Sequence, residues 1–138
     1  MRLLAIDYGL ARIGIAVSDP LMITAQPLKQ LKNDENFFTE FQKVVDYYKV
    51  SKIVLGNPKK LNGSAGTLEP QVLEFKKNIE VITGLEVIFW DERLSTKAVL
   101  GYLNKSELKS KAKKDILDSL SASYLLQGYM DYLDSHKA

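Results

Sequence analysis

Three stretches of the sequence place an acidic residue directly after, or within, an apolar segment. Asp7 follows the run LLAI and precedes Gly9, so we expect it at the tip of a buried strand. Asp91 and Glu92 follow the run VIFW in the same way, and Asp118 lies in a late amphipathic segment. A carboxylate is costly to remove from water unless it is paired or bound to a cation, so these positions indicate a site rather than packing.

Each of these acids could instead have a purely structural role, and the case for such a role differs from one acid to the next. An aspartate can cap a turn through its own backbone, but Gly9 meets that need beside Asp7 without an acid. Asp91 and Glu92 precede Ser95, where a predicted helix begins and where the helix dipole alone favours acids. Because side chains alternate along a strand, at most one of these two acids points towards Asp7.

Asp118 shares a predicted helical face with a line of apolar residues. Steps of four, three and four residues lead from it to Ala122, Leu125 and Tyr129, which should face the sheet. Asp115 lies one turn earlier on about the same face, but it is nearer to lysines with which it can pair. We therefore rank Asp118 ahead of Asp115 as a site residue.

The composition limits what these acids can bind. The chain has 138 residues, no cysteine and a single histidine, His136, so thiolate ligands are excluded and a histidine zinc site is disfavoured. Carboxylates suit Mg²⁺ or Mn²⁺, and two such ions can activate water and stabilise the departing oxygen in an in-line attack on a phosphodiester. No P-loop or dinucleotide-binding signature appears. The acids therefore predict metal-dependent cleavage of a phosphodiester.

The distribution of charge says more about partners than the net charge of +2. Lysines gather in the segment NPKKLNGSAG and again in 104–114, which composition alone predicts to be a solvated loop. Because 104–114 precedes the helix bearing Asp118, it can also guide a phosphate backbone towards the acids. The candidate substrate contacts are Arg93, which is suited to bidentate phosphate binding, and Arg12, Lys59, Lys60, Lys111, Lys113 and Lys114.

The elements that must position these residues alternate between strands and helices in a single α/β domain over 1–138. Strands separated by helices should run parallel, which brings their carboxyl ends, followed by Asp7, Asn57, Asp91 and Glu92, to one edge of the sheet. In order, we expect strands at 3–6 and 13–17 joined by a tight turn, and then an extended piece at 24–31. A helix capped at Asn33 or Asp34, a strand at 52–56 and a helix from Thr67 to Gly84 should follow. The last elements are a strand at 86–90, a helix at 95–103 and a helix at 115–133.

No apolar run is long enough to span a bilayer, so we expect a soluble, cytoplasmic protein.

The periodicity of apolar residues also predicts which helix faces are buried. The predicted buried stripes are Phe37, Phe38, Phe41, Val44, Val45 and Tyr48 in the first helix, and Leu68, Val72, Phe75, Ile79 and Ile82 in the second.

Four segments, in order and spacing over nearly the whole chain, resemble the YqgF/RuvX family of RNase H-like nucleases: MRLLAIDYGLARIGIAVSDP, VLGNPKKLNGSAG, DERLST and LDSLSASYLLQGYM. The resemblance implies an RNase H-like fold, with a five-stranded mixed sheet of order three, two, one, four, five flanked by helices. It implies a homologue of Holliday-junction resolvases, more specifically a nuclease that matures the 5′ end of pre-16S rRNA. The family's catalytic and metal-binding acids fall on Asp7, Glu92 and Asp118, with Asp91 in a capping or supporting role.

Some positions depart from the family pattern. Leu10 and Ala11 stand where a small polar residue and a lysine are usual, and Asn57 stands where an apolar residue is common. Because the acids are present, these departures bear on substrate contacts more than on chemistry.

Several functions remain open from the sequence. The first is a metal-dependent endonuclease acting on structured RNA, with a branched DNA junction as the alternative substrate. An ATP-binding domain of the actin and sugar-kinase type has a similar opening, but that class needs two such domains to enclose a nucleotide. A third is a noncatalytic nucleic-acid-binding module for ribosome assembly. We expect a monomer or a weak homodimer, and a monomer favours RNA because resolvases of four-way junctions generally cut as two-fold dimers.

Overall fold

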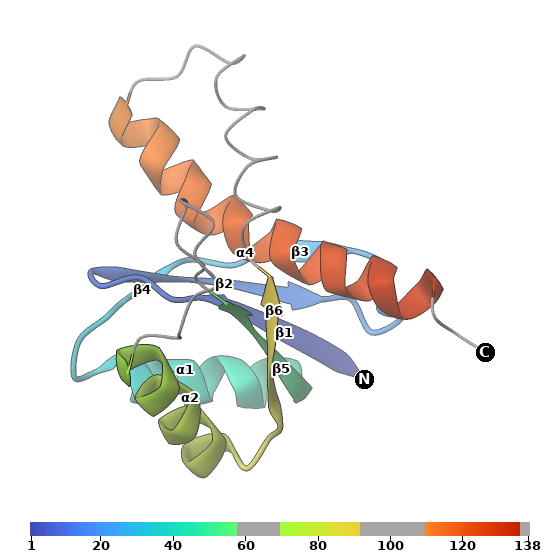
Figure 1. The fold of residues 1–138 in the computed structure, drawn as a ribbon, viewed down its shortest axis with the longest axis horizontal. Helices are drawn as coiled ribbons and strands as arrows, with labels where there is room; N and C mark the ends of the chain where they lie inside the picture. The colour runs from blue at the N-terminus through green and yellow to red at the C-terminus, as the bar shows by residue number, and fades with distance from the viewer. Residues whose placement is uncertain (58–69, 92–109, 136–138) are drawn as a thin grey trace.

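The computed structural model describes residues 1–57, 70–91 and 110–135, with backbone alone at 57, 91, 110–119 and 135. These residues form a mixed sheet of six strands with helices on both faces. Figure 1 shows α1 and α2 together on one side of the sheet and α4 crossing the other side. The α/β class predicted from the sequence is confirmed.

The chain opens with an antiparallel hairpin of β1, Arg2–Asp7, and β2, Arg12–Ser18. The predicted tight connection between them is confirmed, and it requires a glycine at one position. A Cβ atom added at Gly9 would collide with the backbone carbonyl oxygen of Arg12. The close approach of the two backbones in this turn therefore excludes a side chain there.

Parallel strands extend the sheet from β1. β5, Val50–Asn57, pairs with β1, and β6, Val87–Asp91, pairs with β5. The resulting order, β3-β2-β1-β5-β6, confirms the order that the resemblance implied.

A sixth strand was not predicted, because the extended piece at 24–31 divides into two short strands. β3, Ala25–Pro27, pairs with the end of β2, whereas β4, Leu31–Lys32, pairs with its beginning. Pro27 has no backbone N–H to donate, but the backbone N–H of Leu28 still donates to the carbonyl oxygen of Ile15 on β2 (2.8 Å). Residues 28–30 then belong to neither strand. The division lets one long strand, β2, pair with both pieces.

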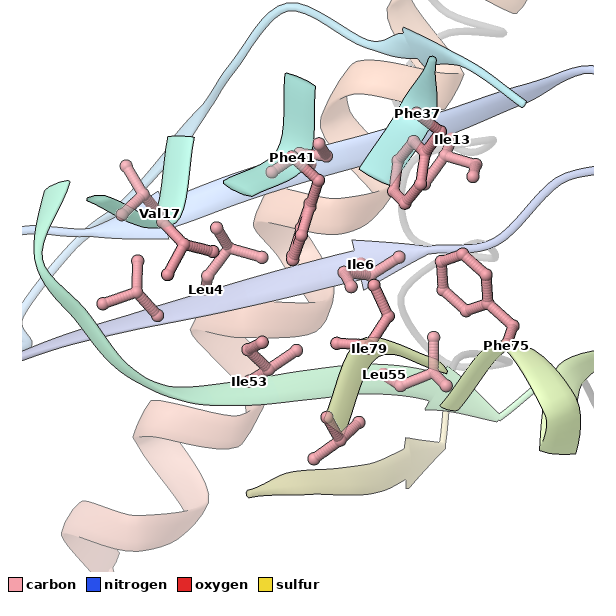
Figure 2. Close-up of a cluster of buried hydrophobic side chains, with 14 of the residues drawn as sticks. Leu4, Ile6, Ile13, Val17, Phe37, Phe41, Ile53, Leu55, Phe75 and Ile79 are labelled. Atoms are coloured by element: carbon pink, nitrogen blue, oxygen red, sulfur yellow. The ribbon is translucent and has the colours of Figure 1, made fainter. Parts of the chain in front are cut away.

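Helices α1, Phe37–Tyr48, and α2, Pro70–Thr83, cover one face of the sheet. The predicted stripes are largely confirmed: Phe37, Phe41, Val45, Val72, Phe75 and Ile79 are buried, and Phe38, Val44 and Tyr48 pack beside them. Figure 2 shows the rings of Phe37, Phe41 and Phe75 over the aliphatic side chains of the central strands.

Two details of these helices differ from the prediction. The N-cap of α1 is Asn36, because Asp34 instead accepts a hydrogen bond from the backbone N–H of Asn36 (2.9 Å) and Asn33 bonds elsewhere. Ile82 was predicted to be buried, but it is 43% exposed. A step of three residues falls short of a full turn of about 3.6, so Ile82 rotates to the edge of the stripe.

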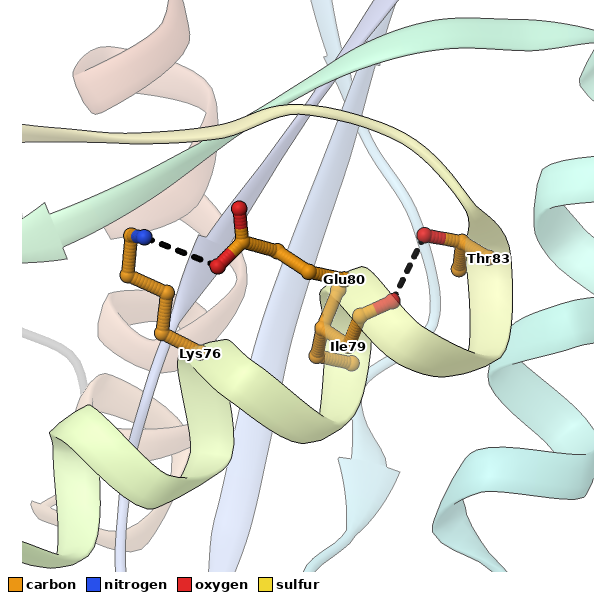
Figure 3. Close-up of polar contacts among 4 residues, drawn as sticks. All are labelled: Lys76, Ile79, Glu80 and Thr83. Carbon is orange, nitrogen blue, oxygen red and sulfur yellow. Dashed lines mark hydrogen bonds and ion pairs between the residues drawn. The ribbon is translucent and has the colours of Figure 1, made fainter.

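Helix α2 ends at Thr83, just before Gly84, as the sequence predicted. Thr83 Oγ1 donates to the carbonyl oxygen of Ile79 (2.6 Å), and Lys76 Nζ lies 2.8 Å from Glu80 Oε1 one turn earlier (Figure 3). Gly84 follows with a φ of +70°, the left-handed conformation that glycine adopts without a Cβ penalty. The predicted helix at 95–103, together with Thr67 and Leu68, lies outside the described residues.

Helix α4, Ser110–Ser135, covers the other face and begins earlier than predicted. The expected line of Ala122, Leu125 and Tyr129 is buried, as predicted. Lysines 111, 113 and 114 lie on the helix rather than in a loop, which corrects the prediction for that part of 104–114. Lysine and alanine are good helix formers, and no glycine or proline separates Ser110 from the amphipathic stretch. Among the described helices, none has the length and hydropathy needed to cross a membrane.

Candidate nucleic-acid cleavage site

The carboxyl ends of three parallel strands meet at one edge of the sheet. β1 ends at Asp7, β5 at Asn57 and β6 at Asp91. Ile6 pairs with Leu55 across β1 and β5, and Asn57 pairs with Asp91 across β5 and β6. The predicted convergence of these strand ends is therefore confirmed at the level of the backbone.

Alternation along β1 assigns Asp7 to the face that α4 covers. Leu3 and Ala5 belong to the core beneath α4, whereas Leu4 and Ile6 belong to the core beneath α1 and α2. Asp7 is the next position in the series of Leu3 and Ala5, and it is half-buried. The carboxylate thus shares the α4 face with the helix that carries Asp118.

A row of four residues crosses the sheet at the level of Asp7. Gly14 on β2 pairs with Asp7, Gly56 follows the partner of Ile6 on β5, and Trp90 on β6 pairs with Gly56. We call these four residues the Asp7 row. The two glycines have no side chains that could cover the carboxylate. Asp7 is therefore the acid of the row, and Trp90 is its one large aromatic residue.

The turn after Asp7 is held by a residue whose role the sequence did not indicate. Asn33 Nδ2 donates to the carbonyl oxygen of Gly9 (2.8 Å), and the backbone N–H of Asn33 donates to that of Ala11 (3.0 Å). The sequence suggested a helix cap for Asn33, because asparagine at a predicted helix start is typical of one. Its long-range bonds, 24 residues apart in sequence for Gly9, have no local signal.

Cationic side chains lie at the same edge of the sheet. Arg12 begins β2, directly after the turn, and pairs in register with Lys32 of β4; both residues are exposed. Arg12 was predicted as a substrate contact, and the structure places it beside the turn that follows Asp7. Lys32 was not singled out, because the pairing of β4 with β2 was not predicted.

Most other predicted site residues cannot be compared with Asp7 in the structure. Glu92, Arg93, Lys59 and Lys60 lie outside the described residues. Asp91, Asp115, Asp118 and lysines 111, 113 and 114 have a described backbone only. Among the side chains that are described, no three acids, histidines or cysteines gather closely enough to hold a metal ion. The three-acid cluster remains a prediction.

The part of the site that is described fits a hard divalent cation. The available acid is a half-buried carboxylate at the end of a central strand, flanked in its row by glycines. With no cysteine in the chain, oxygen atoms are the natural donors, and such donors are those that Mg²⁺ and Mn²⁺ prefer.

The fold is RNase H-like. The structure resembles T. thermophilus RuvC in complex with a Holliday junction substrate, with a TM-score of 0.59 at 15% identity over 99% of this chain and 96% of that one. It also resembles the fowlpox virus resolvase bound to Holliday junction DNA, with a TM-score of 0.55 at 19% identity over 96% and 99% of the two chains. At these identities the likeness shows the fold.

The chain belongs to the RuvX family, whose model, described as Holliday junction resolvase, matches residues 1–132. A relative from Clostridium botulinum (strain Eklund 17B / Type B) is 41% identical over 133 residues, covering 95% of this chain and 97% of the relative. A relative from Agathobacter rectalis is 36% identical over 143 residues and covers both chains fully, 100% of each. Both carry the name "Putative pre-16S rRNA nuclease". The resemblance seen in the sequence is confirmed.

Proposed function

We propose that the chain is a divalent-metal-dependent endonuclease that hydrolyses phosphodiester bonds in nucleic acid and processes the 5′ end of precursor 16S rRNA. The observation that carries the proposal is the position of Asp7. It is a half-buried carboxylate at the carboxyl end of β1, on the α4 face of an RNase H-like sheet. A carboxylate that meets a polyanionic substrate requires a cation between them.

Asp7, Glu92 and Asp118 would hold the ion. Glu92 is the next even-numbered position after Ile88 and Trp90, which both pack on the α4 face. Asp118 lies on α4 one turn before the buried Ala122. When bound, Mg²⁺ or Mn²⁺ would polarise the phosphoryl group and lower the pKa of water.

The other acids are alternates with weaker support. Asp91 follows the odd-numbered Val87 and Phe89, which pack on the α1 and α2 face, so a capping or supporting role suits it better. Asp115 remains the alternate to Asp118 on α4.

The chain's own residues would position the substrate. The Asn33 bonds fix the turn that follows Asp7, which keeps the carboxylate from moving with that turn. Arg12, Arg93, Lys59, Lys60, Lys111, Lys113 and Lys114 would bind phosphates, and the sheet-edge location of Arg12 supports its part in this set.

The names of the relatives favour precursor rRNA as the substrate. A second candidate, cleavage of a four-way DNA junction, is favoured by the description of the family model and by the resolvase fold. The two candidates differ in a measurable way, because symmetric cleavage of a junction requires a two-fold dimer. A chain that sediments as a monomer while it cleaves supports RNA processing.

The experiment is a Mg²⁺-dependent cleavage assay on precursor rRNA and on a four-way junction, with Asp7→Asn beside the parent. We expect Asp7→Asn to lower cleavage by at least about a thousandfold, because a metal ligand supplies several kcal/mol of transition-state stabilisation, while substrate binding persists. The matched control is Asp46→Asn on α1, an exposed aspartate on the opposite face. Cleavage by Asp7→Asn at the parent's rate would remove Asp7 from the cleavage site. A parent that binds RNA without cutting either substrate would favour the noncatalytic binding module.

A further inference from the structure

An aromatic cluster lies between the end of β6 and the last turns of α4. The ring of Trp90 lies 4.9 Å from the ring of Tyr132 and 5.3 Å from that of Tyr129, measured between centroids. The three rings differ in exposure: Tyr129 is 6% exposed, Trp90 is half-buried and Tyr132 is 43% exposed. The cluster therefore extends from the core to the surface.

The cluster is close to the proposed cleavage site. Trp90 belongs to the Asp7 row and shares the α4 face with Asp7, with Gly56 between them. Strands lie about 4.8 Å apart, so two spacings put the Cα atoms of Asp7 and Trp90 roughly 10 Å apart. A strand that is cut beside Asp7 therefore reaches Trp90 within a few nucleotides.

Packing alone accounts for only part of this arrangement. Tyr129 is buried and completes the core beneath α4 with Leu125 and Leu126. Tyr132 contributes little to that core at its exposure, yet its ring lies at an angle of 52° against Trp90. β6 ends the order of strands in the described sheet, so the half-buried ring of Trp90 and the exposed ring of Tyr132 lie at the edge of the sheet. Amphipathic rings at such an edge are the surfaces on which bases stack.

We infer that Trp90 and Tyr132 form a stacking site for an unpaired base of the nucleic-acid substrate, a few nucleotides from the bond that is cut. The inference rests on the proposed function and deepens it, since it selects substrates with a single-stranded segment beside the cleaved bond. Every base has a π face, so the site recognises the absence of pairing rather than a particular sequence.

The experiment uses the fluorescence of Trp90, the only tryptophan in the chain. A short oligoadenylate RNA and an abasic strand of equal length and charge are titrated into the full chain in the presence of EDTA, so that no cleavage occurs. We expect the oligoadenylate to quench Trp90 and to bind about tenfold more tightly than the abasic strand, because only the former has bases that can stack.

Three substitutions of Tyr132 separate stacking from packing. Tyr132→Ala and Tyr132→Leu should each lower affinity for oligoadenylate by about tenfold and leave affinity for the abasic strand unchanged, because leucine fills apolar space without an aromatic face. Tyr132→Phe should keep the parent's affinity. The matched control is Tyr124→Ala, at a position on the same helix that is 40% exposed and lies beside Ala25 and Gln127 instead of Trp90.

The inference is overturned if Tyr132→Ala and Tyr132→Leu bind oligoadenylate as the parent does, which would point to an apolar protein partner for these rings. Equal weakening for both strands also overturns it, because the cluster would then act through phosphates or through the fold. So does a parent whose Trp90 is quenched by neither strand. Cleavage by the parent and its loss in Asp7→Asn would still support the proposed nuclease in each case, so the two failures are distinguishable.

Discussion

The two faces of the sheet are built from side chains of different size. Beneath α1 and α2 the core contains three phenylalanines, and their rings lie 5.4 to 5.5 Å apart for Phe37 with Phe41 and Phe37 with Phe75. Beneath α4 the core contains three alanines, at positions 5, 16 and 122, together with aliphatic and aromatic residues from the helix. The Asp7 row adds two glycines on this second face.

This difference suggests that one face contributes most of the stability and that the other carries the proposed site. Large rings bury the most apolar surface, so the α1 and α2 face should contribute most to the free energy of folding. Small residues leave room for a polar group and bring α4 close to the sheet, where a change of one methyl group alters the position of the helix. The face with the smaller side chains is the one that carries Asp7.

The largest effect is expected from removing a ring on the face beneath α1 and α2. Phe41 is fully buried, and Phe41→Ala should lower the free energy of unfolding by about 3 to 5 kcal/mol, measured by urea denaturation. Tyr47→Ala, at a 79% exposed position on the same helix, should change it by about 0.5 kcal/mol or less. Cleavage per folded molecule should remain at the parent's level, and a loss of activity in folded Phe41→Ala would contradict the division between the faces.

A smaller loss of stability but a larger loss of activity is expected from overfilling the face beneath α4. Ala122 is fully buried, and Ala122→Leu should cost about 1 to 3 kcal/mol in urea denaturation. Because Asp118 lies one turn earlier, displacement of α4 should also lower cleavage per folded molecule. Folded Ala122→Leu with full activity would show that the position of α4 does not matter to the site.

A substitution of Asn33, which directly follows β4, tests whether cleavage depends on the hydrogen bonds that hold the turn after Asp7. Asn33→Ala removes the bond to the carbonyl oxygen of Gly9 and should cost about 1 kcal/mol in stability. Asn36→Ala is the matched control, because the side chain of Asn36 makes no capping hydrogen bond. We expect a higher Mg²⁺ concentration for half-maximal cleavage in Asn33→Ala and an unchanged one in Asn36→Ala. Identical Mg²⁺ dependence of the two variants would remove Asn33 from the support of the site.

The smallest effect is expected at the opposite end of the sheet, in the turn between β2 and β3. Hydrogen bonds from the backbone N–H groups of Thr24 (2.9 Å) and Ile23 (2.6 Å) to Asp19 Oδ1 lower the pKa of Asp19 below its ordinary value of 3.8. A lowered pKa means that the contribution to stability is present above about pH 3.8 and is lost as the pH falls through the folded-state pKa.

Asp19→Asn should therefore flatten part of the loss of thermal stability as the pH falls from about 3.8 through the folded-state pKa, and leave cleavage unchanged. Melting curves of the parent and the variant across that range measure it. Parallel curves would mean that the Asp19 turn is not coupled to folding.

Much of the fold could be predicted because its signals are local. The period of apolar residues in α1 and α2 predicted which side chains are buried, and Gly84 predicted the end of α2. The tight turn before β2 predicted a hairpin, and helices between strands predicted the parallel pairs. Each of these features depends on residues that are near one another in sequence.

The errors arose where local patterns did not reflect the tertiary surroundings of a residue. Asn33 had the chemistry of a helix cap, but the carbonyl oxygens of the β1 to β2 turn take its hydrogen bonds. Ile82 had the spacing of a buried residue, but the stripe of α2 is narrower than its sequence pattern. The lysines after Ser110 had the composition of a loop, but they continue a helix that packs on the sheet.

The sequence by itself determined the succession of strands and helices along the chain, the acid at the end of β1 and, through its motifs, the family, because apolar periodicity and short motifs are readable without a partner. The tertiary structure decided that Asp7, two glycines and Trp90 form one row, and that this row lies on the face with the smaller side chains. The register of the strands determines both results, because a shift of one strand by one residue would turn all of its side chains to the other face of the sheet.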